Sequence, residues 1–379
     1  MKLSTSLLAV AMLVAGCGGP SPHAAATPSA NARGSPASSP SATAAASPAS
    51  SPGASPTTSP AASPVPLTGA FAVLSTLPSG DSYTVSIVAA NGKVVGSAQP
   101  SSPTAVTCGD AAAAVVPLPI STSDDRAYYM DAQGVVRFMT VQGETGRATT
   151  VPVGGGRRSM FAVSPDDQRI AVVVSDFTAS GVSIRLYVED LNGATNHVEI
   201  YTSNGAYGLW PIGWHGTDNL VVAKVPSCSQ GGGQFCCGPL ELHVVDPATA
   251  VRRFTLGGPD CVLAGPPSPA GAVCENNTFT VATIYNWTAV QTGGFPIGAP
   301  TSAYLSPDGQ HVAVVSGSTT AIYRTNTTLS LQACGWIDST HVISGGDVQQ
   351  QPRIGNVSTG AVVPVAVQGT CAGRLPGGL

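Results

Sequence analysis

The residues of this chain with the most chemistry open to them are its nine cysteines. The last eight are Cys108, Cys228, Cys236, Cys237, Cys261, Cys274, Cys334 and Cys371. An even number of cysteines in an oxidising compartment predicts a set of disulfides, although the vicinal Cys236-Cys237 would need two separate partners. Zinc is the weaker alternative, because the chain has no Cys-x-x-Cys pair and no His follows the cluster at ligand spacing. We therefore expect disulfides, no metal and no cofactor.

Cys261 and Cys274 are the pair that we predict to be bonded. Cys261 directly precedes the apolar run 262–264, and Cys274 ends the run that follows the turn 269–271. If the two runs are antiparallel strands, the returning chain brings both cysteines to the same end, with opposed Cβ atoms about 4.5–5.5 Å apart. The alternative is two free thiols, since an offset of one residue would point the side chains to opposite faces.

Two pairs of neighbouring carboxylates, Asp124-Asp125 and Asp166-Asp167, are the next candidates for chemistry. Both lie in segments that predict tight turns, where Asp accepts hydrogen bonds from nearby backbone amides. Glutamates are scarce, the histidines are scattered, and neither a Gly-x-Ser-x-Gly elbow nor a His-Glu-x-x-His motif occurs. We therefore predict no enzymatic activity and assign no catalytic residue.

The ninth cysteine, Cys17, lies in an N-terminal targeting pattern. Lys2 precedes the apolar run 7–15, which is too short to cross a bilayer and is typical of a secretory signal. The run ends in Leu-Val-Ala-Gly-Cys at 13–17, which resembles the lipobox of bacterial lipoproteins. The resemblance implies a signal peptide at 1–16 and a lipid on the thiol of Cys17 that holds the chain to the extracytoplasmic side of the cell membrane. An ordinary signal peptide that contains a cysteine by chance is the alternative.

The segment 17–66 is predicted to be a disordered linker. After Cys17 it consists almost entirely of Ser, Ala, Pro, Thr and Gly, with no acidic or aromatic residue and Arg33 as its one Lys or Arg. Such a segment cannot bury enough apolar surface to offset its chain entropy. Its repeated Ser-Pro pairs favour extended polyproline II conformations, which would hold the domain at 67–379 away from the membrane.

The domain at 67–379 contains a repeated hairpin pattern. The segments 161–173 and 304–315 both read aromatic, apolar, Ser-Pro-Asp, two or three turn residues and then a β-branched run. Degenerate copies occupy 121–129 and 268–273, and the segments 213–221 and 335–343 match each other around a Trp. The anchors of the pattern are Ser121, Ser164, Trp214, Ser268, Ser306 and Trp336. Their spacing is near the period of about forty residues of a four-stranded propeller blade.

This pattern resembles the WD-repeat-like units of TolB-type β-propellers. The resemblance covers 67–367 and implies an all-β fold of four-stranded blades, with departures at Ala270 and in the loops around Gly231 and Gly293. The six anchors predict six blades, and the strand-like runs at 83–98, which have no anchor, suggest one more. We favour seven blades; in the alternative, these first strands join the last blade and six blades close the ring. The matched positions of Trp214 and Trp336 favour packing over a sugar-stacking role.

The resemblance implies a scaffold or protein-interaction role, with an envelope protein as the partner, although propellers host many functions. The alternative is a binding or sensing module for cell-wall glycan or a small molecule at the channel mouth. A hydrolase or lyase that uses residues of the channel is the third possibility. A formal net charge of −4 without a basic stripe argues against a nucleic-acid partner.

Overall fold

The computed structural model describes residues 68–78, 80–106, 116–178, 181–205, 207–226 and 240–379. The predicted signal peptide, the lipid site Cys17 and the linker 17–66 lie outside these residues. Four cysteines also lie outside them, namely Cys108, Cys228, Cys236 and Cys237. Within the described part of the chain, no helix has the length and apolar character that a membrane crossing requires.

The described residues form twenty-eight strands in seven antiparallel sheets of four. Blade 1 consists of β28 (Thr370–Leu375), β1 (Phe71–Ser75), β2 (Val85–Ala89) and β3 (Val94–Ala98). Blade 2 consists of β4 (Ile120–Thr122), β5 (Arg126–Met130), β6 (Val135–Thr140) and β7 (Thr145–Thr150). Blade 3 consists of β8 (Arg157–Val163), β9 (Arg169–Thr178), β10 (Gly181–Asp190) and β11 (Val198–Gly205). Blade 4 consists of β12 (Tyr207–His215), β13 (Asn219–Pro226), β14 (Glu241–Val245) and β15 (Arg252–Gly257).

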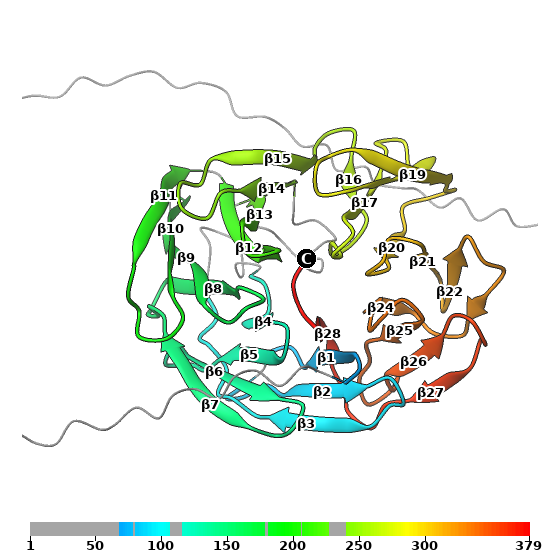
Figure 1. Ribbon diagram of the computed structural model, residues 1–379, viewed down its shortest axis with the longest axis horizontal. Helices are drawn as coiled ribbons and strands as arrows, with labels where there is room; N and C mark the ends of the chain where they lie inside the picture. The colour runs from blue at the N-terminus through cyan, green and yellow to red at the C-terminus, as the bar shows by residue number, and fades with distance from the viewer. Residues whose placement is uncertain (1–67, 79, 107–115, 179–180, 206, 227–239) are drawn as a thin grey trace, which may run out of the picture. The chain divides into compact units, whose positions relative to one another are not determined.

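The three remaining sheets complete the ring. Blade 5 consists of β16 (Val262–Leu263), β17 (Ala272–Glu275), β18 (Val281–Tyr285) and β19 (Gln291–Pro296). Blade 6 consists of β20 (Ser302–Leu305), β21 (Val312–Ser316), β22 (Thr319–Tyr323) and β23 (Thr328–Leu329). Blade 7 consists of β24 (Ala333–Trp336), β25 (His341–Ser344), β26 (Arg353–Asn356) and β27 (Val362–Pro364). Figure 1 shows the seven blades around a central axis, so the fold is a seven-bladed β-propeller, as the sequence pattern predicts.

The ring closes by pairing the two ends of the domain. β28 supplies the first, innermost strand of blade 1, where Phe71 pairs with Leu375 and Ser75 with Thr370. The repeated pattern marks the turn between the first and second strands of a blade. In blade 1 that turn does not exist, because its first strand comes from the end of the chain and its second from the beginning. This is why the sequence has six anchors although the described fold has seven blades.

The anchor turn has the same hydrogen bonds in blades 3 and 6. Ser164 Oγ donates to Asp166 Oδ1 at 2.6 Å and accepts from the Arg169 amide at 2.9 Å. Ser306 Oγ makes the equivalent bonds to Asp308 Oδ1 at 2.6 Å and from the His311 amide at 2.9 Å. The turn residue with positive φ is Asp167 (59°) in one copy and Gly309 (72°) in the other.

In blade 2 the anchor shifts by two residues from the predicted position. Ser121 belongs to β4, and the buried Ser123 accepts the Arg126 amide at 3.2 Å. The register moves because the turn of blade 2 is two residues shorter: the serine and the bonded arginine are three positions apart in blade 2 and five positions apart in blade 3.

The apolar core lies between neighbouring blades, and two buried tryptophans bond across these interfaces. Trp214 Nε1 donates to the Ala162 carbonyl of blade 3 at 3.0 Å, and Trp336 Nε1 donates to the Tyr304 carbonyl of blade 6 at 2.8 Å. The Arg169 guanidinium lies 4.8 Å from the ring centre of Trp214. These contacts agree with the predicted packing role of both tryptophans.

Two disulfides are present among the described residues. Cys261 is joined to Cys274 within blade 5, with Cα atoms 4.8 Å apart. The register places Leu263, not Cys261, opposite Cys274, so the two cysteines are diagonal neighbours rather than the opposed pair that we expected. The second disulfide, Cys334–Cys371, joins β24 of blade 7 to β28 of blade 1 across the closure of the ring.

Candidate functional site

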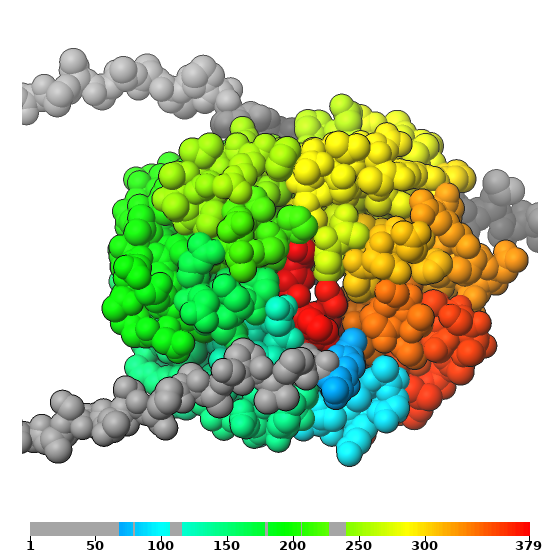
Figure 2. Space-filling view, in the orientation of Figure 1, coloured from blue at the N-terminus to red at the C-terminus, as the bar shows by residue number. Residues whose placement is uncertain are grey.

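A cavity of about 220 Å³ lies in the central channel, and every blade contributes to its wall. The contributing elements are β28, β4, β8, β12, β20, β24 and the segment 266–269 of blade 5. Figure 2 shows the last residues of the chain, in red, in the middle of the ring. The cavity exists because the first strands of the seven blades surround the axis without filling it.

The wall of this cavity is mostly apolar. Six prolines line it, at positions 117, 211, 266, 267, 269 and 307. Tyr304 and Trp336 add aromatic surface, and the Cys334–Cys371 disulfide adds sulfur. Proline presents no N–H donor, so this wall offers shape and apolar contact rather than hydrogen bonds.

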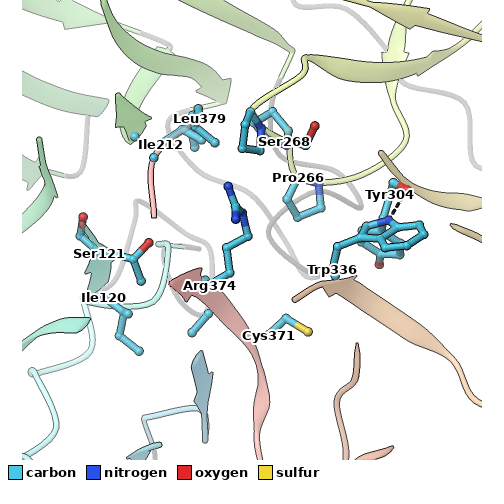
Figure 3. A pocket seen from close by; sticks show the side chains of 18 of the residues that line it. Ile120, Ser121, Ile212, Pro266, Ser268, Tyr304, Trp336, Cys371, Arg374 and Leu379 are labelled. Carbon is cyan, nitrogen blue, oxygen red and sulfur yellow. Dashed lines mark hydrogen bonds between the residues drawn. The ribbon is translucent and has the colours of Figure 1, made fainter. Parts of the chain in front are cut away.

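One cation reaches into the cavity. Figure 3 shows the side chain of Arg374, from β28, extending into the space between Ser121, Ile212 and Pro266. In the described part of the chain the Arg374 guanidinium makes no ion pair and no hydrogen bond. Burial lowers the pKa of Arg374, whereas the charges of Asp124 and Asp338 raise it. An arginine remains charged under such a shift, so the cavity holds a positive charge without a bonded counterion.

The backbone beside Arg374 is constrained by Gly373. This residue has a φ of 148°, and a Cβ there would lie 2.8 Å from Thr122 Cγ2. The pairing of β28 with β1 also shifts register next to Gly373. A glycine is therefore required for β28 to pass blade 2 and present Arg374 to the channel.

Residues 376–379 continue from Arg374 across the channel. The Gly377 amide donates to the Ser123 carbonyl at 2.7 Å, and the Leu379 amide donates to the Trp214 carbonyl at 2.7 Å. His215 Nδ1 lies 2.6 Å from the Leu379 carbonyl oxygen. These bonds tie the segment to blades 2 and 4, so that Leu379 becomes part of the cavity wall.

The two predicted carboxylate pairs come together at the interface of blades 2 and 3. The Asp124 amide donates to the Pro165 carbonyl at 3.0 Å, which joins the two turns. Asp166 accepts bonds within its own turn, the capping role predicted from the sequence. Burial, and then the charges of Asp167 and Asp166, raise the pKa of Asp124.

Asp167 has a role that the sequence did not indicate. Its side chain is buried, accepts a bond from the Tyr128 hydroxyl at 2.8 Å and lies 3.3 Å from Arg126 Nη1. Burial raises the pKa of Asp167 to about 6, although bonds from Ser123 and Tyr128 favour the charged form. Asp167 therefore links blades 2 and 3 through a carboxyl whose charge is costly to bury.

Three of the described histidines have different partners. His215 contacts the channel segment, whereas His311 stacks on Trp336 with ring centres 6.5 Å apart. His341 bonds Asp338 at 3.0 Å. No group of three or more potential ligands that could hold a metal ion occurs within the residues described.

A second cavity, of about 460 Å³, lies between blades 3 and 4, and we call it the rim groove. Ile184, Leu186 and Val222 form part of its apolar floor. Tyr201 and Tyr207 line it while remaining 43% and 51% exposed. Sequence reasoning missed this groove, because both tyrosines lie in ordinary strand patterns and only the spacing of the blades exposes them.

Charged side chains form one connected network along the blade 4 side of the rim groove. Glu241 accepts from Lys224 Nζ at 3.3 Å and bonds His243 at 2.7 Å. The Arg252 guanidinium lies 3.4 Å from His243 Nε2. These bonds, chiefly that from His243, lower the pKa of Glu241. The groove thus combines exposed aromatic surface with more positive than negative side chains.

Comparisons with known proteins identify no family for the chain. No protein-family model matches the chain, and no curated protein matches its sequence. A chain from the mitotic checkpoint complex is 12% identical over 72% of this chain and 83% of its own length, with a TM-score of 0.43. BamB from Moraxella catarrhalis is 12% identical over 66% of this chain and 76% of its own, with a TM-score of 0.37.

A peptidase is also among the similar solved structures. The Pyrococcus horikoshii acylaminoacyl peptidase is 9% identical over 78% of this chain, with a TM-score of 0.42, and the match covers 52% of that chain. At such identities and TM-scores the similarities carry no inference about what the chain does. Neither an enzymatic nor a non-enzymatic role follows from them.

Proposed function

We propose that the chain is a lipid-anchored β-propeller of TolB type on the extracytoplasmic side of the cell membrane, where it acts as an interaction module for an envelope protein. The pattern at 13–17 supports the anchor, and the composition of 17–66 supports a spacer between membrane and propeller. The two disulfides of the described residues support an oxidising compartment.

The observation that carries the interaction role is the clustering of exposed apolar side chains on blades 3 and 4. Six of the eleven large apolar side chains that are exposed in the described residues belong to these two neighbouring blades. They are Val198, Tyr201, Tyr207, Leu240, Val251 and Phe254. Exposed apolar surface next to a polar network is typical of protein contacts, so we place the partner at the rim groove.

The double substitution Tyr201→Ser and Tyr207→Ser tests this surface. Both side chains are partly exposed, so the variant should keep the wild-type thermal unfolding temperature while its crosslinking to envelope proteins in intact membranes falls about tenfold. Val348→Ser is the matched control, because Val348 is 82% exposed on blade 7, away from the groove. Equal crosslinking by the double variant and the wild type would contradict the proposal.

The anchor is tested by Cys17→Ser. The expected result is loss of the protein from the membrane fraction or accumulation of unprocessed precursor, because the hydroxyl cannot take the place of the lipidated thiol. Normal processing with retention of the lipid would refute the anchor at Cys17. The interaction surface on blades 3 and 4 is tested separately by the tyrosine variant.

A second candidate function, ligand binding in the channel, is favoured by the central cavity. An apolar wall with few polar groups is typical of small-molecule sites, and Arg374 supplies a charge that orients a ligand. We rank this function second because the cavity of about 220 Å³ is small. Cell-wall glycan fits the cavity less well, since the prolines of its wall offer few hydrogen-bond donors.

A further inference from the structure

We propose that the central channel binds an organic carboxylate, with Arg374 pairing to the carboxylate group and the proline-rich wall covering the apolar body of the ligand. The proposal rests on the second candidate function, ligand binding in the channel, and names its ligand class. It does not depend on lipidation or on the rim groove.

The charge of Arg374 is the first argument. A half-buried guanidinium loses part of its hydration, and burial lowers its pKa accordingly. Among the described residues no side chain pairs with it. A ligand oxyanion would restore the lost bonds, and the planar fork of arginine matches the two oxygens of a carboxylate. Arg374 is therefore the group through which the cavity would recognise an anion.

The surrounding charges decide which anion fits. Asp124 and Asp338 act on Arg374 electrostatically, yet neither carboxylate forms an ion pair with it in the described structure. A ligand with one negative charge can pair with Arg374 against this background. A phosphate monoester with close to two charges would be repelled more strongly by the same two carboxylates. The dianion is also attracted more strongly to Arg374, but its transfer from water to the apolar wall costs more than that of a monoanion, and on this ground the site favours a carboxylate over a phosphate.

The wall selects an apolar body for the ligand. Figure 3 shows Ile212, Pro266 and Leu379 around the guanidinium of Arg374, and Ile120 also lines the cavity. Ser268 directs its hydroxyl away from a ligand, because Ser268 Oγ donates to the Ser306 carbonyl at 3.3 Å. An aromatic or branched aliphatic body would fill the space between these apolar side chains.

Titration calorimetry of the purified full chain with three probes tests the proposal. Benzoate carries the carboxylate on an apolar ring, benzamide is its neutral analogue, and phenyl phosphate carries the larger charge. We expect benzoate to bind at least about tenfold more tightly than benzamide and more tightly than phenyl phosphate, because charge-assisted hydrogen bonds contribute roughly that factor or more. Tighter binding of phenyl phosphate, equal binding of benzamide, or no binding of benzoate would each overturn the carboxylate assignment.

Variants connect the binding to the channel. Arg374→Met should weaken benzoate binding at least about tenfold, whereas Arg147→Met, at an exposed position of β7 in blade 2, should leave it unchanged. Because Arg374→Met could impair folding, Asp124→Asn provides a gain of function. The Asp124 side chain makes no hydrogen bond among the described residues, and loss of its charge should tighten benzoate binding severalfold.

The variants also separate the inference from the proposed interaction. Unchanged benzoate affinity in both Arg374→Met and Asp124→Asn would refute the channel site. If Arg374→Met still crosslinked to envelope proteins and the Tyr201 and Tyr207 variant did not, the interaction role would hold independently of the channel ligand.

Discussion

Replacing Asp167 by Asn should remove a pH-dependent part of the stability of the propeller. Asp167 is 5% exposed and lies in the anchor turn of blade 3, against the strand β5 of blade 2. Burial raises the pKa of Asp167 from its ordinary value of 3.8 to about 6. Asn has the same shape, can accept the bond from Tyr128, and tolerates the positive φ of 59° at this position.

The sign and size of the pH effect on stability follow from the difference between the pKa of this carboxyl in the folded and in the unfolded chain. Below pH 3.8 the carboxyl is protonated in both the folded and the unfolded chain and has no effect on the folding equilibrium. Between pH 3.8 and about 6 the folded chain holds the proton and the unfolded chain does not, so stability falls as the pH rises. Above this window the buried charge costs about 3 kcal/mol, and lowering the pH from 7 to 4.5 should regain about 2 kcal/mol.

Urea unfolding of wild type and Asp167→Asn at pH 7 and pH 4.5 measures this effect. The free energy of unfolding of the wild type should gain about 2 kcal/mol relative to the variant on going to pH 4.5. Asp166→Asn is the matched control, because it removes the neighbouring exposed carboxylate and should keep the increment. A difference between wild type and Asp167→Asn that does not change with pH would refute the argument that burial dominates the pKa of Asp167.

Three further changes test the closure, the boundary and the blade contacts. Replacing Cys334 and Cys371 together by Ala opens a loop of 37 residues and should lower the free energy of unfolding by about 4 kcal/mol, measured with denaturant under oxidising conditions; equal stability would exclude a closing role. A chain that begins at Leu67 should keep the thermal transition of the full chain, because the composition of 18–66 predicts no packed structure; a large fall in Tm would contradict that prediction. Trp336→Phe leaves the Tyr304 carbonyl without its donor and should cost about 1–3 kcal/mol in thermal unfolding, and an unchanged Tm would show that this bond contributes nothing net.

Much of the fold could be predicted because the repeat is local. The turn at Ser164 and the turn at Ser306 form the same bonds from the same few neighbouring residues, so a short segment carries its own conformational signal. The signal was weaker where the turn was altered, and the anchor of blade 2 was therefore placed at Ser121 instead of Ser123. The anchors mark six blades, and the seventh is formed by the pairing of β28 with β1, which joins residues from opposite ends of the domain.

The candidate sites were harder to predict because they arise between segments that are distant in the sequence. Arg374 is an ordinary residue in the last strand, and only the closure of the ring places it in the channel. The rim groove depends on the angle between blades 3 and 4, which no single segment of the sequence determines. By itself the sequence predicts the export pattern and the linker, which stay predictions, and it determined the strand-turn repeats, since these depend on neighbouring residues. The tertiary structure alone decided how the ring closes through β28, the disulfide across the closure, the buried charge of Asp167 and the cation in the channel, because each requires contacts that form only when the blades pack in a ring.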